Sequence, residues 1–189
     1  MLSYAEIQRS VQGAWLLARG DTRGMALFDL SLEGFWKSFA AALLVAPAYA
    51  IVLLDQYSVI GWPEHVAGTV FAEAVSFALG WLAFPIITAF LTRLLGLSAR
   101  YVPLIVANNW SAVVQVALYT AVVLIGTLLP AQLRTLALFV ATIAVLTYQW
   151  FVIRTALGTT NATAFGLVVV DILTSIVLSR GLDGLLQPG

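Results

Sequence analysis

Long apolar runs separated by short polar segments dominate the pattern of this chain. A helix needs roughly 20 mostly apolar residues to cross the hydrocarbon core of a bilayer. Five runs meet that requirement: 35–54, which ends at Asp55, then 66–91, 102–129, 132–153 and 161–179. The pattern therefore predicts an all-α fold, a polytopic integral membrane helical bundle with five transmembrane helices.

The segment that precedes the first run has a pattern of its own. Apolar side chains recur there at helical spacing and predict an amphipathic helix, with members Ile7, Val11, Ala14, Trp15 and Ala18. Such a helix either lies in the headgroup plane or packs beneath the bundle. Further along, the short stretch 28–32 leads into the first span, with Ser31 as a candidate helix cap.

This division predicts three parts of the chain. Residues 1–34 form a cytoplasmic N-terminal amphipathic segment, and residues 35–180 form the five-helix transmembrane domain. Residues 181–189 form a short external tail.

Composition agrees with the hydropathy pattern. The chain has 189 residues, of which 61% are hydrophobic and 10% are charged, and its mean hydropathy is +0.98. Soluble domains are typically ~45–50% apolar and ~25% charged, so this chain has too few charges to cover a water-facing exterior. We expect membrane lipids as its main partners. The formal net charge of zero lacks the basic footprint of nucleic-acid binding.

Few side chains are available for catalysis or metal binding. Cysteine is absent and His65 is the single histidine, which argues against thiol chemistry and Cys/His metal sites. We therefore expect no enzyme, no metal and no cofactor. An aspartyl-type site would require Glu73 and Asp171 within about 3 Å, sharing a proton.

The distribution of Lys and Arg predicts an orientation. Seven basic residues fall on the side of the N-terminus, and two fall on the other side: Arg9, Arg19, Arg23, Lys37, Arg93, Arg100 and Arg154 against Arg134 and Arg180. Cytoplasmic segments carry the excess of basic residues. We expect a multi-pass protein of the bacterial inner membrane with its N-terminus in the cytoplasm and its C-terminus outside.

The third run carries amides that an apolar span does not require. Asn108, Ser111 and Gln115 share one helical face, while Asn109 points about 100° away. Amides inside a membrane hydrogen-bond across helices, so one interpretation is that they join neighbouring spans. The other is that they line a polar path for a substrate or an ion.

Two acids also fall inside the runs. Glu73 lies in the second run, and Asp171 lies in the middle of the fifth with Thr174 and Ser175 on its face. An Asp at that depth costs ~2.5–3.5 kcal/mol of insertion free energy, which the neighbouring Leu, Ile and Val residues offset by roughly 4 kcal/mol. The two acids are either neutral structural carboxyls or a proton relay.

Small and aromatic residues predict contacts and anchors. Two small-xxx-small series predict close helix packing, within the chain or between subunits: Ala42, Ala46 and Ala50, and Ala137 and Ala141. Aromatic side chains near the ends of the runs are typical of membrane-interface belts: Trp36, Tyr57, Trp62, Tyr101, Tyr148 and Trp150.

The layout resembles the Yip1-type membrane proteins. Two stretches carry the resemblance: the entry Arg100-Tyr101-Val102-Pro103 into the amide-bearing run, and 28–39, which looks like the pre-membrane stretch of small bacterial inner-membrane proteins. The resemblance implies a non-enzymatic integral membrane protein. Its eukaryotic relatives act in vesicle traffic with small GTPases through a long cytosolic N-terminal region. The segment before the first run is short in this sequence, so we do not expect GTPase binding to carry over.

These observations favour one function over another. We expect a structural, membrane-organising or complex-accessory role without catalysis, carried out as a homo-oligomer or as a subunit of a larger membrane complex. The alternative is a small proton- or cation-linked transporter or channel component that uses Glu73 and Asp171.

Overall fold

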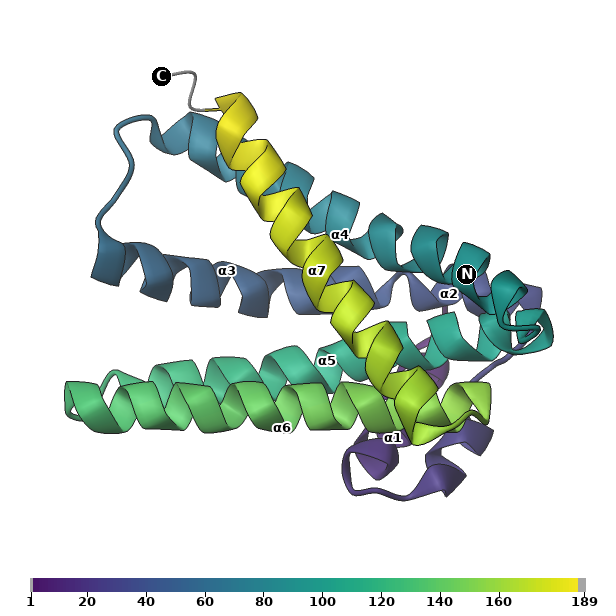
Figure 1. Ribbon diagram of the computed structural model, residues 1–189. Helices are drawn as coiled ribbons and strands as arrows, with labels where there is room; N and C mark the ends of the chain where they lie inside the picture. The colour runs from purple at the N-terminus through teal and green to yellow at the C-terminus, as the bar shows by residue number, and fades with distance from the viewer. Residues whose placement is uncertain (1, 187–189) are drawn as a thin grey trace.

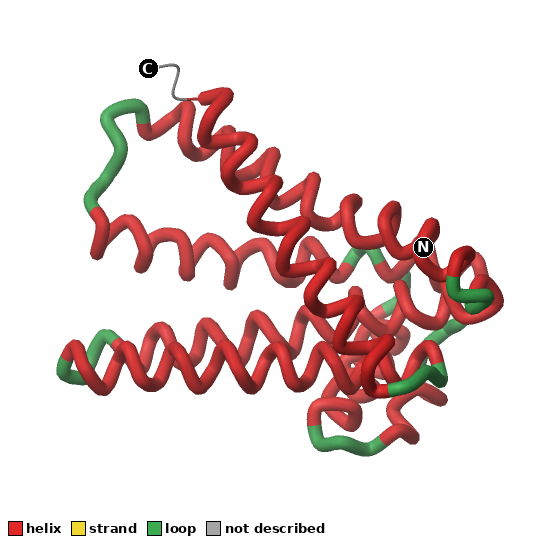
Figure 2. The backbone as a smooth tube through the Cα atoms, viewed as in Figure 1, coloured by secondary structure: helices red, strands yellow, loops and turns green. Residues whose placement is uncertain are grey.

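The computed structural model describes residues 2–186, and every regular element in that range is helical (Figure 2). The elements are α1 (Tyr4–Ala18), η1 (Thr22–Leu27), α2 (Leu32–Ser38), α3 (Ala41–Ile60), α4 (Val66–Leu94), η2 (Ser98–Arg100), α5 (Tyr101–Gly126), α6 (Ala131–Leu157) and α7 (Asn161–Leu186). The predicted all-α fold is confirmed for the described residues.

Five helical stretches are long and apolar enough to cross a membrane. They are Leu32–Ile60, Val66–Leu94, Ser98–Gly126, Ala131–Leu157 and Asn161–Leu178. Each corresponds to one of the five runs of the sequence, so the number and the order of the candidate spans are confirmed.

The first span differs most from its predicted boundaries. It begins as the separate short helix α2, capped by Ser31 as predicted, because the Ser31 hydroxyl accepts a hydrogen bond from Gly34 N at 3.0 Å. It then continues as α3 past Asp55 to Ile60. The predicted end at Asp55 is wrong because Arg134 pairs with that carboxylate and lets the helix extend.

Three other helices also run past their predicted ends, and α4 does so by three residues, from 91 to Leu94. Helix α6 extends beyond Arg154 to Leu157, where Gly158 caps it in the left-handed conformation at φ 61°. Helix α7 continues to Leu186. Of the predicted tail 181–189, residues 181–186 therefore belong to this helix, and residues 187–189 lie outside the described part of the chain.

The helices alternate in direction and form two groups (Figure 1). Helix α5 packs against α3 and α6, while α7 crosses from α6 to α4. We call the end that holds α1, η1 and α2 the α1 end, and the end that holds loops 61–65 and 127–130 the far end. Toward the far end, α4 and α7 lean away from α3, α5 and α6.

Dense packing is concentrated at the α1 end. The most completely buried side chains come from the first half of α5, the last half of α6 and one face of α1, and include Leu104, Ile105, Val152, Ile153, Ala14 and Leu17. In α3 and α4, the buried residues also lie in the half nearer this end. The core of the bundle therefore sits next to the N-terminal segment.

Helix α1 packs under the bundle, which is one of the two predicted alternatives. Its buried face consists of Ser10, Gly13, Ala14 and Leu17, and the Tyr148 hydroxyl of α6 donates to Ala14 O at 2.6 Å. Trp15 points away from this face and is 56% exposed. Contact of Trp15 with lipid headgroups stays a prediction.

An ion-pair clasp joins α1 to α2. Lys37 Nζ lies 2.7 Å from a carboxylate oxygen of Glu6 and 2.7 Å from one of Glu33. Glu6 also takes part in a capping box with Ser3 at the start of α1. The hydrogen bond from Lys37, together with those from Ser3, lowers the pKa of Glu6 to about 2.

We expect acid to open this clasp. Because the folded-state pKa of Glu6 lies below its ordinary value, the contact stabilises α1 fully above about pH 4.5 and is lost as the pH falls toward 2. Protease sensitivity of the N-terminal segment in detergent should rise across that window. In Glu6→Gln the same sensitivity should be present at pH 7, and an unchanged profile would contradict the contact.

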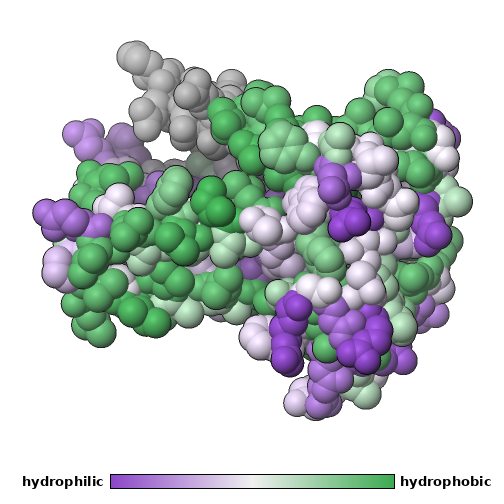
Figure 3. All heavy atoms as spheres, turned by 60° about the horizontal axis from the view of Figure 1, so that its bottom comes forward, coloured by the Kyte–Doolittle hydropathy of each residue, from purple (hydrophilic) through white to green (hydrophobic). Residues whose placement is uncertain are grey.

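The surface has the distribution expected for lipid contact. Apolar side chains cover the long helices, and hydrophilic side chains gather over the α1 end, with a smaller group at the far end (Figure 3). Large apolar residues on these helices are widely exposed, among them Leu43, Phe71, Ile86, Leu128, Phe139 and Val177. The exterior of the bundle is thus suited to an apolar solvent.

Candidate functional site

A pocket of about 370 Å³ lies between α3 and α4 at the far end. The two helices diverge there and are joined by loop 61–65 (Figure 1). The pocket is lined by Ala46, Tyr49, Ala50, Leu53, Leu54, Tyr57, Trp62, Pro63, Val66, Thr69, Val70, Glu73, Ala74 and Phe77. Its walls are therefore almost entirely aliphatic and aromatic.

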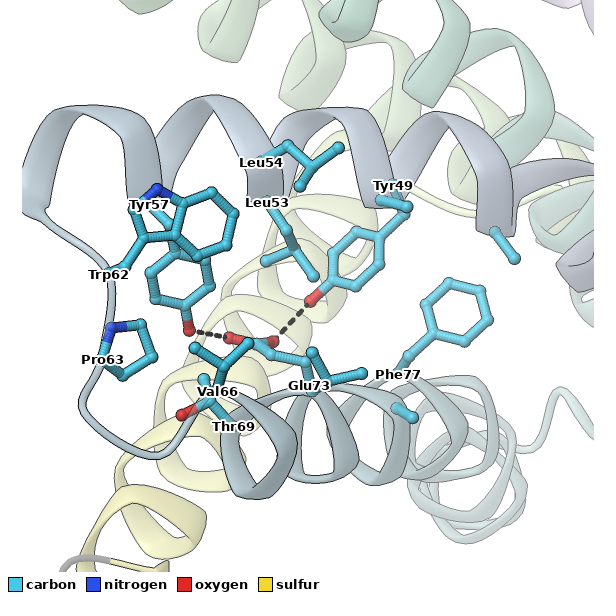
Figure 4. Close-up of a pocket in the computed structure, with 14 residues that line it drawn as sticks. Tyr49, Leu53, Leu54, Tyr57, Trp62, Pro63, Val66, Thr69, Glu73 and Phe77 are labelled. Atoms are coloured by element: carbon cyan, nitrogen blue, oxygen red, sulfur yellow. Dashed lines mark hydrogen bonds between the residues drawn. The ribbon is translucent and has the colours of Figure 1, made fainter.

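Among the described residues that line this pocket, Glu73 carries the only ionisable carboxyl group. The Tyr57 hydroxyl donates to Glu73 Oε1 at 2.8 Å, and the Tyr49 hydroxyl donates to Oε2 at 3.1 Å. Figure 4 shows the Glu73 side chain reaching from α4 toward the two phenol groups of α3. The acid that the sequence marked as a candidate thus bridges two candidate spans.

Aromatic neighbours fix the two tyrosines. Tyr57 stacks on Trp62 with ring centroids 5.9 Å apart, and Tyr49 lies against Phe77 with centroids 5.1 Å apart. Because eight residues turn a helix by about 80° beyond two full turns, Tyr49 and Tyr57 can both reach the α4 side of α3. An aromatic pair therefore positions each of the two tyrosines that contact Glu73.

The geometry leaves acceptor capacity on the Glu73 carboxyl group. An ionised carboxylate has roughly four lone-pair positions, and the tyrosines occupy one on each oxygen. The remaining positions can accept from a donor that enters the pocket. Chemically, the site offers one acid, two phenols and a large apolar wall.

Asp171 has a separate partner elsewhere in the bundle. Gln149 Nε2 of α6 donates to Asp171 Oδ2 at 2.6 Å. The hydroxyls of Thr174 and Ser175 donate to carbonyls of their own helix, Val170 O and Asp171 O. The predicted cluster on this face is therefore joined to α6 only through the Asp171 carboxyl group.

The described structure does not bring Asp171 and Glu73 together. Glu73 lies 21 residues from the α1-end terminus of α4 at Leu94, whereas Asp171 lies ten residues from the α1-end start of α7. At 1.5 Å per residue, this difference of 11 residues places them at depths that differ by roughly 17 Å. An aspartyl-type pair needs about 3 Å, so this arrangement is unlike such a site.

We expect Gln149→Leu to destabilise the bundle by roughly 1–2 kcal/mol, because it leaves the Asp171 carboxyl group without its amide donor. Asp171→Asn is the matched control, since an amide pair can still bond and should cost little. Unfolding in mild detergent monitored by circular dichroism measures both. Equal losses for the two variants would contradict the assignment.

The amides of α5 lie in different surroundings. Asn109 is buried and donates to the Ser38 hydroxyl at 2.9 Å, which joins α5 to α2. Gln115 Nε2 is buried without a hydrogen-bond partner among the described residues, and Ser111 Oγ lies near the Tyr148 hydroxyl but outside hydrogen-bond geometry. Asn108 is half-buried. Of the four polar side chains Asn108, Asn109, Ser111 and Gln115, Asn109 is thus the one for which the described structure shows the predicted interhelical hydrogen bond.

The small-residue series lie in two different places. Ala46 and Ala50 line the α3–α4 pocket, while Ala42 is half-buried. Ala137 and Ala141 line a shallow depression between α5 and α6, where Ala141 is buried. Their use between subunits stays a prediction.

Sequence reasoning missed several residues of these contacts. The sequence pattern predicts an interface anchor at Tyr57 and a helix end at Asp55, and it assigns no role to Tyr49. The available signal was the presence of two tyrosines and an acid within 25 residues of apolar sequence. Whether these side chains pair depends on which helices are neighbours in the bundle.

Comparison with known proteins gives no match: no family model, no curated protein and no solved structure is significantly similar to this chain.

Proposed function

We propose that this chain is a non-catalytic integral membrane protein with a structural, membrane-organising or complex-accessory role. The observation that supports the proposal is the use of polar side chains to join the candidate spans. Asn109 bonds to Ser38, Gln149 to Asp171, Arg134 to Asp55, and the Tyr101 hydroxyl to Pro85 O. A bundle joined at fixed points along its length suits a scaffold, because rearrangement would break these bonds.

The proposed orientation places the N-terminus in the cytoplasm of a bacterial cell and the C-terminus outside. Its support is that Arg93 near the end of α4, Arg100 at the start of α5 and Arg154 near the end of α6 all fall at the α1 end. That end also carries the basic residues of the N-terminal segment. Cytoplasmic loops carry such an excess.

Reporter fusions test the orientation. A C-terminal alkaline phosphatase fusion should be active and a C-terminal green fluorescent protein fusion should be dark, while an N-terminal fluorescent fusion should be bright. Bright fluorescence from both ends would overturn the five-span orientation.

Assembly is the second part of the proposal. We expect the purified protein to run as a homo-oligomer or to bring partner membrane proteins with it after extraction in mild detergent. Five spans with short connections are also the layout of the Yip1-type proteins, and membership in that family is part of this proposal. Cross-linking in membranes followed by mass spectrometry identifies the contacts. A strictly monomeric protein without partners in both measurements would contradict an assembly role.

A proton- or cation-linked transporter is the second candidate, and the acid in the α3–α4 pocket favours it. Flux in proteoliposomes separates the two. The scaffold role predicts no proton-dependent flux above that of empty vesicles. Flux that disappears in Glu73→Gln and Asp171→Asn, with assembly unchanged, would favour transport.

A further inference from the structure

The α3–α4 pocket combines one acid with an apolar and aromatic wall. Thirteen of its fourteen lining residues carry no ionisable carboxylate, amine, imidazole or guanidinium group, and the exception is Glu73. No Lys, Arg or His stands among these described lining residues. The charge of an ionised Glu73 is therefore left without a cationic partner from the wall itself.

Both Glu73 oxygens are used as acceptors. Tyr57 and Tyr49 each present a hydroxyl to one of them. Two neutral donors lower the free-energy cost of placing a carboxylate in an apolar medium, but they do not cancel its charge. A cation that enters the pocket would complete the compensation.

The wall indicates what kind of cation fits. An inorganic ion requires several oxygen ligands, whereas this wall offers one carboxyl, two phenols and the Thr69 hydroxyl, which already donates to His65 O. The faces of tyrosine, tryptophan and phenylalanine rings attract organic cations. The aliphatic part of the wall matches an apolar body, and about 370 Å³ lies within the range of small-molecule pockets.

The rim of the pocket is open to the surroundings of the bundle. Leu54 is 55% exposed and Val70 is 61% exposed, and both lie on the wall. A ligand dissolved in the outer layer of a membrane would meet these side chains first. An amphipathic molecule can therefore reach Glu73 without crossing the dense core at the α1 end.

We infer that the α3–α4 pocket binds an amphipathic organic cation, with its charged group on Glu73 and its apolar body between α3 and α4. A free lipophilic cation fits better than the ammonium group of a phospholipid, because the lipid phosphate would bring a second negative charge toward the carboxylate. This inference goes beyond the scaffold role and does not depend on it.

Binding of radiolabelled tetraphenylphosphonium to the full chain in lipid nanodiscs tests the inference, with empty nanodiscs subtracted. We expect saturable binding of this cation and none of tetraphenylborate, which has the same shape and the opposite charge. Glu73→Gln should weaken the affinity about tenfold or more, as the loss of a charged partner does. Asp171→Asn, which changes an acid outside the pocket, should leave the affinity unchanged.

A second variant guards against misfolding of Glu73→Gln. Ala50→Trp places a large ring at an exposed position on the pocket wall and should abolish binding while the circular dichroism melting curve is kept. Equal affinity in wild type, Glu73→Gln and Ala50→Trp would overturn the site, as would non-saturable binding in wild type. Loss of binding only in nanodiscs that contain phosphatidylethanolamine would overturn the free cation in favour of a lipid headgroup.

Discussion

Gly34→Ala is expected to reduce the free energy of unfolding by about 3 kcal/mol, as forced overpacking at a buried backbone contact does. A Cβ atom at Gly34 would collide with the carbonyl oxygen of Asp29 and would lie 2.7 Å from its carbonyl carbon. Backbone atoms cannot move aside as a flexible side chain can. Helix α2 would have to shift, and with it the contact of Ser38 with Asn109. Unfolding in mild detergent measures the loss.

Gly80→Ala is the matched control for this prediction. Apart from the adjoining backbone of α4 and the two chain neighbours, nothing in the described structure would lie within 4 Å of a Cβ atom at Gly80, and alanine is favoured over glycine inside a helix. The control should leave stability unchanged or slightly raised. A neutral Gly34→Ala would show that Asp29 does not approach α2 this closely.

Arg134→Gln is expected to reduce the free energy of unfolding by roughly 2 kcal/mol. Breaking a fully buried ion pair costs more, but both side chains of this pair keep some exposure. Arg134 Nη2 contacts the two carboxylate oxygens of Asp55 at 2.8 and 2.6 Å. Without the guanidinium, Asp55 would stand alone inside the first candidate span. The far-end part of α3 should then lose contact with α6, and unfolding measurements should report lower stability.

The opposite variant of this pair should be milder. After Asp55→Asn, the long Arg134 side chain can extend toward the headgroup region and stay solvated. A double-mutant cycle with Asp55→Asn and Arg134→Gln isolates the pair energy. Additive losses in the cycle would mean that the two side chains do not interact in the folded protein.

The number of candidate spans was predictable because backbone polar groups in lipid must be satisfied internally. A run of about 20 apolar residues then has essentially one regular solution, the helix. The predicted end of the first span at Asp55 is the exception, because the helix continues past this residue. Its partner Arg134 lies 79 positions further along the chain, and a carboxylate in isolation is a reasonable place to end a span.

The candidate site was only half predictable. A carboxyl group inside an apolar span is costly without a partner, and the sequence identifies Glu73 as a candidate for this reason. The partners Tyr49 and Tyr57 depend on how α3 turns about its axis relative to α4. Such rotation follows from packing, and the apolar pattern of α3 surrounds the whole helix and leaves no preferred face.

The uneven distribution of the core has a consequence for local opening. Among the described residues, α3 and α4 bury side chains only in the halves nearer the α1 end, at Ala41, Val45, Phe84, Pro85, Thr88 and Thr92. Segments with few buried contacts open at lower free energy than the rest of a protein. The walls around Glu73 can thus adjust the width of the pocket at lower cost than the densely packed α1 end of α3 and α4.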